Sequence, residues 1–566
     1  MSNESRKLRI LWCGESSFLN TGYSVYAKEL LIRLHSSNKY EIAEMGCYAE
    51  AKEPKVQDIP WRFYPTLPIN DEERNIYASS STAQFGEWRF DDICLDFKPD
   101  VVIDIRDWWM MEYQNRSPFR KFFKWAVMPT VDSEPQQEQY INTYIEADAV
   151  FTYSEFGKDV LEKNSNGHIN VLDICSPAAN FEFLKPVSNK KQHKKAFGFL
   201  DNVNLVGTVM RNQRRKLYPN LISTFRKLLD QNPSIQQNTF LYIHSSYPDV
   251  GWDLPYFLRR YNMGNHTLFT YKCKSCGSFF PSFFQGSLIP CNRCGQKSAV
   301  MPNTNFGVTT EELGQILNCF DLYVQYSVCE GFGMPQVEAA ACGIPVISVD
   351  YSAMESVGKN IKADMVRNKE FFWDLNTHSQ RAIPDDNDLL EKMKKFISLP
   401  QSMKSKKGMD AYIGVKKHYS WDNCANSWEK YLDSIEPQNE EETWLSEPAI
   451  KDIPEEIPAN LGNKEIVDWS MENVLGGKEN IDQYIALRIL RDLNSGQSMS
   501  GQFGLYYNEF SQFETNIAAA SYTQQDAVRN LIEIRQKINA AEEKRAEMIH
   551  CKDDSWKSQF LHGVKP

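Results

Sequence analysis

The sequence of 566 residues predicts an α/β protein with two Rossmann-like doubly wound domains, a short cysteine-rich insertion and an α-helical C-terminal extension. Three observations predict this fold class. Apolar runs typical of strands alternate with helical patterns up to about residue 180, and again from about residue 204. Four cysteines interrupt the second alternation. From about residue 436 the sequence is rich in acidic residues and contains several prolines.

Length and composition narrow the class of protein. The length allows about three domains, and a hydrophobic content of 42% is enough for large cores. The net charge of −11 argues against a generally basic nucleic-acid coat, although local basic patches remain open. We expect no signal peptide and no transmembrane helix, since no apolar stretch approaches about 20 residues. Nine of the 13 cysteines are scattered, which is typical of a reducing compartment and favours a cytoplasmic location.

The N-terminal domain is expected over residues 1–185. Residues 8–14 (LRILWCG) form a candidate first strand, and the loop ESSFLNTG leads into a helix that begins near Gly22. A strand, a glycine-containing loop and a helix N-terminus in this order form a potential phosphate site. Further strands are expected at residues 99–105, 124–132 and 149–154.

The second α/β domain is expected over residues 196–420. The basic segment before it, residues 185–195 (KPVSNKKQHKK), is interpreted as an exposed interdomain linker. The strand NLVGTVM is followed by the basic loop RNQRRK, which holds Arg211 and Lys216, and then by an amphipathic helix. Further elements are strands at 240–246, 266–271 and 322–327, and a helix with a capping box of Thr309 and Glu312.

Residues 327–347 (SVCEGFGMPQVEAAACGIPVI) are the most informative segment. Gly331 and Gly333 remove side chains where backbone N–H groups must point outward, and the proline that follows suits a first helical turn. Such a loop and the helix dipole favour phosphate. Glu330 precedes the glycines. Glu338, eight positions later, lies one turn into the helix, where it can accept hydrogen bonds from a pair of sugar hydroxyls. The next strand completes a loop–helix–strand unit at one edge of a parallel sheet.

This segment resembles the signature of family-4 retaining glycosyltransferases, which have the two-domain GT-B fold and use nucleotide-diphosphate sugars. The resemblance covers about residues 8–435 and ends in a helix at 421–435 that crosses back onto the N-terminal domain. It implies transfer of a hexosyl or pentosyl group from a UDP or GDP sugar with retention of anomeric configuration, and no catalytic metal. An ordinary buried βαβ unit of another α/β enzyme is the alternative.

The resemblance also implies roles for individual residues. Glu330 lies by the donor sugar and phosphates in such enzymes, and Glu338 binds the ribose diol. Arg211 and Lys216 neutralise the diphosphate, and Arg214 and Arg215 can share or replace that role. The residues expected to bind the donor are Gly22, Arg211, Lys216, Glu330, Gly331, Phe332, Gly333, Met334 and Glu338.

The catalytic assignment departs from the family in one place. Many relatives carry a histidine in the N-terminal domain near the reacting sugar, but this chain has none between residues 36 and 167. Asp132 is the nearest substitute, and Asp107 is a weaker candidate. The expected catalytic residues are therefore Glu330, Asp132, Arg211 and Lys216.

Residues 271–300 hold two C-x2-C pairs, Cys273 with Cys276 and Cys291 with Cys294, separated by 14 residues. Four thiolates placed as two knuckles fit a tetrahedral Zn²⁺ and leave no open position, so we expect a structural zinc ribbon near the donor pocket. An all-thiolate iron site is the alternative. The four phenylalanines between the knuckles form either the core of the ribbon or a stacking surface for acceptor bases.

The last part of the chain carries no recognised motif. Residues 436–460 are interpreted as an acidic linker, and residues 461–566 as a helical extension with helices at 464–475, 479–494 and 523–549. The extension is a helical subdomain, an oligomerisation element or an acceptor-binding module.

The expected function is a glycosyltransferase with a saccharide or glycan acceptor. One alternative is glycosylation of a modified nucleic-acid base, which a ribbon near the interdomain cleft favours and the net acidity opposes. A second alternative is a non-catalytic sugar-nucleotide-binding or scaffold protein.

Overall fold

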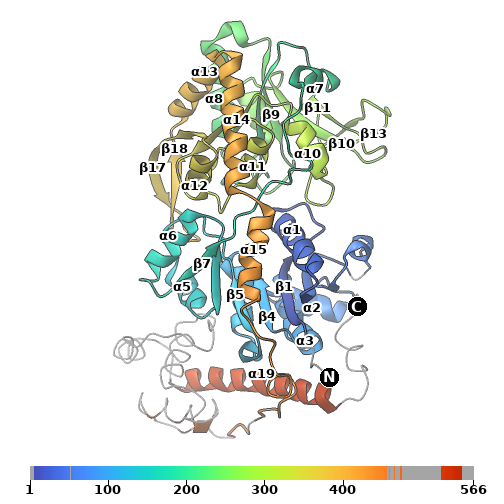
Figure 1. The fold of residues 1–566 in the computed structure, drawn as a ribbon, viewed down its shortest axis with the longest axis vertical. Coiled ribbons are helices and arrows are strands. Elements are labelled where there is room, and N and C mark those ends of the chain that lie inside the picture. The colour runs from blue at the N-terminus through green and yellow to red at the C-terminus, as the bar shows by residue number, and fades with distance from the viewer. Residues whose placement is uncertain are drawn as a thin grey trace.

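The computed structural model describes residues 6–50, 52–450 and 524–550, and a few isolated positions between residues 452 and 473. Two α/β units stack along the long axis of the molecule, and helices cover the sheet of each unit (Figure 1). The predicted architecture of two doubly wound units is therefore confirmed. No helix within these described ranges is long and apolar enough to cross a membrane.

The first unit contains a seven-stranded sheet in the order β3-β2-β1-β4-β5-β6-β7, and every strand pair in it is parallel. Its central strands are continuous apolar runs because helices cover both faces. Its strands are β1 Leu8–Glu15, β2 Tyr40–Cys47, β3 Arg62–Pro65, β4 Val101–Asp104, β5 Lys124–Val127, β6 Ala149–Thr152 and β7 Val171–Ile174. Its helices are α1 Gly22–Ser36, α2 Asp71–Ser79, α3 Glu87–Phe97, α4 Trp108–Asn115, α5 Glu138–Ile145 and α6 Glu155–Asn164.

The second unit contains a nine-stranded sheet in the order β12-β13-β10-β9-β8-β14-β15-β16, with β11 also paired to β10. Its parallel strands are β8 Asn204–Val209, β9 Thr239–His244, β10 Thr267–Cys273, β14 Leu322–Val324, β15 Val346–Val349 and β16 Asp364–Val366. The antiparallel strands β11 Phe279–Phe283, β12 Leu288–Pro290 and β13 Lys297–Val300 belong to the cysteine-rich insertion. The helices are α7 Lys190–Ala196, α8 Tyr218–Gln231, α9 Leu254–Arg260, α10 Thr310–Leu317, α11 Met334–Ala341, α12 Ala353–Asn360, α13 Asp386–Ser398 and α14 Gln401–His418.

One sequence interpretation of the second unit holds and another needs a small correction. The capping box of Thr309 and Glu312 is present at the start of α10. The strand after the 327–347 motif is β15, but it is not the edge of the sheet, because β16 pairs with its outer side.

A β-hairpin outside both sheets extends from the second unit to the first. It consists of β17 Asn368–Trp373 and β18 Gln380–Pro384. Gln380 N donates to Glu134 O at 2.8 Å, and the hydroxyls of Ser133 and Ser379 lie 2.8 Å apart. The hairpin therefore joins the two units beside the segment that follows β5.

Helix α15, Trp421–Leu432, crosses back onto the first unit as expected and packs beside α1 (Figure 1). The indole of Trp428 is buried and donates from Nε1 to the Tyr26 hydroxyl at 2.9 Å. Its ring centroid lies 4.1 Å from that of Phe151 on β6. An aromatic contact of this kind buries a large apolar area, so α15 is part of the core of the first unit.

Two segments expected to be linkers are each fixed to the fold by a few residues. Residues 185–195 are mostly exposed, as expected, but they also form most of α7, and the buried Lys194 bonds Asp321 at 2.6 Å. In the segment 436–460, the Trp444 side chain is 1% exposed, with its ring 5.1 Å from that of Phe122. The charged composition of each segment predicts a linker, but a few apolar or ion-paired residues in it pack against the rest of the protein.

Helix α19, Gln524–His550, confirms the predicted helix at 523–549 and lies at the base of the first unit (Figure 1). Its Arg545 is 1% exposed, pairs with Glu542 at 2.6 Å and donates to Ser446 O at 2.6 Å. The predicted helix at 479–494 lies outside the described residues, as does the one at 464–475 apart from isolated positions.

Candidate functional site

The glycine loop of the 327–347 motif leads into α11 as its sequence indicates. Gly333 is the N-cap of the helix with φ +83°, a conformation that favours glycine, and a proline occupies the first turn. A Cβ atom on Gly331 would lie 2.5 Å from Thr130 Cγ2 of the first unit. Glycine at this position therefore allows the two units to touch at the start of α11.

The basic loop after β8 is joined to the strand that leads into this motif. Leu217 N donates to Tyr326 O at 3.1 Å, and Val328 N donates to Arg215 O at 3.0 Å. With the loop held in this way, the Lys216 ammonium forms an ion pair with Glu330 Oε1. The Lys216 side chain is 8% exposed and the Glu330 side chain is 5% exposed. Arg215 Nη2 lies 3.6 Å from Glu330 Oε2. Two cations thus share one carboxylate at the N-terminus of α11.

Burial and charge act in opposite directions on this cluster. Burial alone raises the pKa of Glu330, but the charges of Lys216 and Arg215 outweigh it and hold that pKa below its usual value. Burial lowers the pKa of Lys216 to about 8 despite the attraction of Glu330. Arg215 Nε is buried without a hydrogen-bond partner among the described residues. Buried donors normally have partners, so this group has unused capacity to bind an anion.

Arg211 lies in the same loop but faces elsewhere. Its guanidinium bonds both carboxylate oxygens of Asp249 at 3.1 Å, and its side chain is 49% exposed. Of the arginines that the sequence places in this loop, Arg215 is the one that contacts Glu330. The sequence could not rank them, because the contact depends on the pairing of the loop with residues 326–328.

Glu338 lies on the second turn of α11, as expected. Its side chain has no hydrogen-bond or ion-pair partner among the residues described, and burial raises its pKa to about 7. Such a carboxylate is available to accept hydrogen bonds from a ligand. Phe332, in contrast, points inward, with its ring 5.5 Å from that of Tyr419.

The N-terminus of α1 lies opposite that of α11. A Cβ atom on Gly22 would be 3.8 Å from Met334 Sδ, so the two helix starts face each other across the boundary between the units. The loop before α1 is held by the buried Glu44, which accepts from Ser17 N at 2.7 Å and from Trp61 Nε1 at 2.8 Å. Both phosphate-type loops predicted from the sequence thus meet at one place.

A second group of side chains from the first unit lies next to this boundary. The Tyr23 hydroxyl is 3.1 Å from Asp107 Oδ2 and 2.8 Å from Thr130 Oγ1, the residue that touches Gly331. Burial, with the nearby Asp132 carboxylate, raises the pKa of Asp107 to about 7. Asp107 ends the loop after β4, where ligands bind in open parallel sheets.

The Asp132 carboxylate contacts other side chains of the protein. Its Oδ2 lies 3.2 Å from Cys329 Sγ and 3.5 Å from Arg381 Nη1, and its Oδ1 accepts from Ser133 Oγ at 2.8 Å. Arg381 comes from the β17–β18 hairpin and also donates to Cys329 Sγ at 2.7 Å. No sequence signal singled out Arg381, because a lone arginine in a hairpin has no motif.

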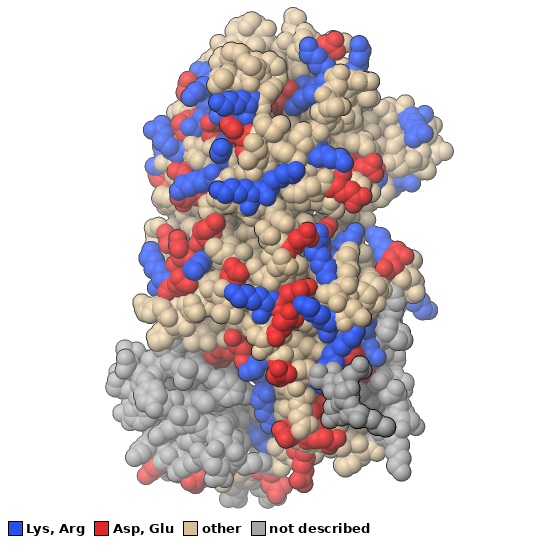
Figure 2. Space-filling view, viewed as in Figure 1, with Lys and Arg blue, Asp and Glu red and all other residues tan. Residues whose placement is uncertain are grey.

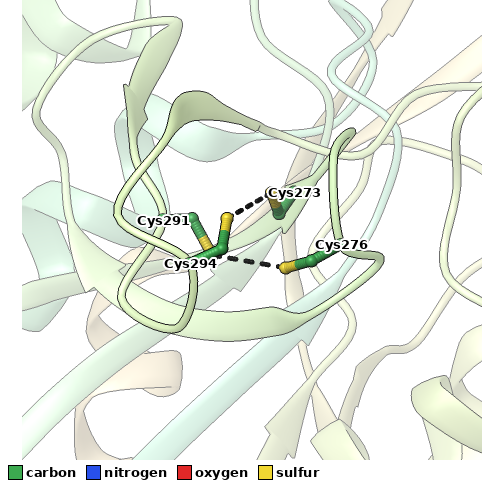
Figure 3. A group of neighbouring side chains, drawn as sticks. All are labelled: Cys273, Cys276, Cys291 and Cys294. Atoms are coloured by element: carbon green, nitrogen blue, oxygen red, sulfur yellow. Dashed lines mark hydrogen bonds between the residues drawn. The ribbon is translucent and has the colours of Figure 1, made fainter.

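The four expected metal ligands come together at the end of β10 (Figure 3). All four sulfur atoms lie within 4.8 Å of one another, and the Cys273–Cys294 and Cys276–Cys291 sulfur pairs are each 3.7 Å apart. A tetrahedron with Zn–S bonds of about 2.3 Å has edges of about 3.8 Å, so the residues fit zinc. Gly277 and Gly295 both have φ +72°, which lets each knuckle turn.

The phenylalanines of the insertion pack mainly within the protein. Phe280 is 7% exposed against Tyr271, Phe279 lies 5.8 Å from Phe197 of the segment after α7, and Phe284 lies 5.8 Å from Phe269. Phe283 is 38% exposed. The interpretation of these residues as a small core therefore agrees with the structure better than a stacking surface made of all four.

The insertion returns to the boundary between the units. After β13, Thr304 O accepts from Asn20 Nδ2 at 3.0 Å, in the loop that precedes α1. Lys272, at the base of the insertion, bonds Glu312 at 2.7 Å. The knuckles themselves project sideways from the second unit (Figure 1).

Comparison with known proteins places the chain among known folds. Residues 302–403 match the family model described as "Glycosyl transferases group 1". No curated protein matches the chain.

Several solved structures have a similar fold over most of the chain. Sucrose-phosphate synthase from Thermosynechococcus elongatus is 15% identical with a TM-score of 0.55, over 76% of this chain and 98% of that one. Anabaena Alr3699/HepE, in complex with UDP and glucose, is 12% identical with a TM-score of 0.52, over 76% of this chain and 100% of that one. A UDP-forming α,α-trehalose-phosphate synthase from Burkholderia vietnamiensis is 9% identical with a TM-score of 0.50, over 76% of this chain and 100% of that one. The chain therefore has the GT-B fold, and its residues 302–403 match the glycosyl transferases group 1.

Proposed function

We propose that the protein transfers a sugar from a nucleotide-diphosphate sugar, UDP- or GDP-linked, to a saccharide or glycan acceptor with retention of anomeric configuration. The observation that carries this proposal is the buried cluster of Lys216, Arg215 and Glu330 at the N-terminus of α11. Two cations, a helix N-terminus and a glycine loop together suit a diphosphate.

The donor is held by groups from both units. Lys216 and Arg215 bind the diphosphate, and Arg211 joins them by exchanging Asp249 for a phosphate oxygen. The Glu338 carboxylate accepts hydrogen bonds from the ribose diol. Gly331 and Gly333 keep the backbone close to the phosphates, and Gly22 does the same from α1. Uracil is the favoured base because the Anabaena structure contains UDP and the Burkholderia protein is named UDP-forming.

The reaction breaks the bond between the anomeric carbon and the diphosphate oxygen, which keeps the electron pair. The acceptor hydroxyl oxygen forms the new bond on the same face, and its proton passes to the departing phosphate. Lys216, Arg215 and the helix N-terminus stabilise the charge that develops there. Glu330 orients the Lys216 ammonium beside the donor sugar. Asp132 positions Arg381, and we assign contact with sugar hydroxyls to Asp107 and Tyr23.

The four cysteines hold a structural zinc ion in this proposal. Cys273, Cys276, Cys291 and Cys294 supply four thiolates, and a zinc ion bound to them joins the two knuckles. A closed set of four thiolates stabilises the fold and takes no part in the reaction. The transfer itself involves no metal in this proposal.

Calorimetric titration with UDP and GDP tests the donor assignment. The wild-type protein should bind at least one of them, and Lys216→Ala should weaken binding about 100-fold, since it removes a charged hydrogen bond worth about 3 kcal/mol. Lys227→Ala, an exposed lysine on α8, is the matched control. If neither nucleotide binds, the proposal is wrong.

Product analysis separates the remaining alternatives. With the matching sugar nucleotide, proton NMR of the first product formed should show the same anomeric configuration as the donor. Inversion would contradict the stereochemical part of the proposal. Nucleotide binding without hydrolysis or transfer to any acceptor would favour the non-catalytic sugar-nucleotide-binding or scaffold protein.

A further inference from the structure

The cysteine-rich insertion differs in charge from the rest of the chain. Residues 271–300 contain Lys272, Lys274, Arg293 and Lys297 but no aspartate or glutamate, whereas the whole protein has a net charge of −11. Lys272 is engaged with Glu312 at the base of the insertion. The other three side chains belong to exposed residues at the knuckles. In the space-filling view, Lys and Arg are the charged residues seen on the projecting insertion (Figure 2).

These three charges gather around the metal-binding knuckles. Lys274 follows Cys273 directly and its backbone N donates to Ser298 O at 2.9 Å, so it lies beside the residue that follows Lys297. Arg293 is part of the second knuckle, whose cysteine sulfur lies 3.7 Å from that of Cys276. None of the three makes an ion pair with a described residue. They are therefore free to bind a partner.

The end of helix α7 lies beside the insertion and adds two exposed lysines. The Phe197 ring, directly after this helix, lies 5.8 Å from that of Phe279, which follows the first knuckle. Lys191 and Lys195 on α7 are exposed, while their neighbours Lys190 and Lys194 pair with Asp321. We define the basic face as Lys191, Lys195, Lys274, Arg293 and Lys297.

We propose that this basic face binds single-stranded nucleic acid. Charge complementarity selects a polyanion, because five cations without an ion-pair partner among the described residues attract a chain of regularly spaced phosphates. Two exposed apolar side chains of the insertion favour nucleic acid over other polyanions: Phe283 is 38% exposed and Leu288 is 45% exposed. Phe283 lies on the same insertion, four residues along β11 from Phe279, and an exposed aromatic ring can stack on an unpaired base.

The position of the basic face connects it with the proposed reaction. The segment that leaves the insertion contacts Asn20 in the loop before α1, at the boundary between the two units. The base of the insertion therefore lies at the boundary where the donor site is proposed, and the knuckles project away from it. The inference adds a second binding surface to the proposed function. Binding of nucleic acid there does not depend on sugar transfer and leaves the saccharide or glycan acceptor of that proposal unchanged.

Fluorescence anisotropy with a labelled single-stranded DNA of about 20 nucleotides tests the inference. The full-length zinc-loaded protein is titrated at about 50 mM and about 200 mM salt. Binding should be tighter at low salt. The variant Lys274→Gln/Arg293→Gln/Lys297→Gln should lose about 10-fold in affinity and reduce the salt slope by about 2, at about 0.7 per lost phosphate contact.

A matched control removes the same number of charges elsewhere on the second unit. Lys227, Lys406 and Lys417 are exposed and lie on α8 and α14, so the variant with glutamine at all three should bind like wild type. Phe283→Ala should weaken binding several-fold without changing the salt slope, because stacking is not ionic. Zinc content and the thermal transition establish that each variant is folded.

Three results would overturn the inference: no binding at low salt, equal losses in the control and knuckle variants, or tighter binding of a sulfated polysaccharide fragment than of DNA. These measurements are made without a sugar nucleotide in the solution. Failure here therefore leaves the donor assignment intact, and failure to bind UDP or GDP leaves the anisotropy result intact.

Discussion

The Lys216 ammonium and the Glu330 carboxylate form an ion pair in which both side chains are buried, at the point where α11 begins. A buried pair contributes little net stability, because desolvation offsets attraction. Removing one partner is costly, however, because it leaves an uncompensated charge. Arg215 Nε has no hydrogen-bond partner among the residues that the structure describes, so this arrangement is suited to a ligand that shares the positive charge.

Lys216→Met should destabilise the protein by about 3 kcal/mol, because it leaves Glu330 buried with only Arg215 as a nearby cation. Urea unfolding measures this change. In the double variant Lys216→Met/Glu330→Gln, stability should largely recover, since the one charge left in this cluster is that of Arg215, whose side chain is 37% exposed to water, but donor binding should stay lost. Recovery of both would show that the pair is structural only.

Donor affinity should fall as the pH rises through about 8, the value to which burial lowers the pKa of Lys216. Below that pH the ammonium is charged and attracts the diphosphate, and above it the amine is neutral. Titration with a sugar nucleotide between about pH 7 and about pH 9 measures the effect, since its diphosphate does not titrate there. Lys216→Arg keeps its charge and should show no such fall. Equal pH dependence of the two proteins would contradict the assignment.

Glu338 should discriminate between a ribose and a deoxyribose. Wild type should bind UDP more tightly than 2′-deoxy-UDP by about 1.5 to 3 kcal/mol, the value of a hydrogen bond to a charged group. Glu338→Ala should bind the two nucleotides equally. The two proteins and two nucleotides form a double-mutant cycle. A general loss of affinity in the variant lowers the binding of both nucleotides equally and so does not change the difference between them. Unchanged discrimination in the variant would exclude Glu338 from the diol.

Gly331→Ala should weaken donor binding by separating the two units, because the added Cβ would lie 2.5 Å from Thr130 Cγ2. Thr130→Ser removes that methyl group and keeps the hydroxyl that bonds Tyr23. The double variant should therefore recover much of the lost affinity, as measured by calorimetry. Without recovery, the loss would have a cause other than this contact.

Metal analysis of the purified protein should find about one zinc per chain. Cys273→Ser should lose the metal and destabilise the insertion, whose small core depends on it. The control is Cys319→Ser, which changes a buried cysteine just after the C-terminus of α10 that is not one of the four ligands. This variant should keep its zinc. Iron in place of zinc in the wild type would favour the alternative all-thiolate site.

Features with a local physical cause could be predicted from the sequence. The capping box at Thr309, the left-handed Gly333 and the cysteine knuckles depend on residues within one turn of each other. The order of strands and helices followed from the same local signals. Two doubly wound units were thus expected from patterns that tertiary contacts did not override, and the GT-B fold was expected from the family resemblance of residues 327–347.

Features that depend on distant contacts could not be predicted. Arg215 contacts Glu330 only because its loop pairs with residues 326–328. Arg381 reaches Asp132 because a hairpin joins the two units. Trp444 lies in an acidic segment whose composition suggests a linker, and its single indole is enough to bury part of that segment against Phe122.

The return of α15 and α19 to the first unit has a consequence for how the chain is made. The first unit receives Trp428, Trp444 and Arg545 from the end of the sequence, more than 200 residues after its own last strand. During synthesis it therefore stays without part of its core until the ribosome has completed the second unit. The unit that is translated first can bury its last side chains only after the second unit has been translated.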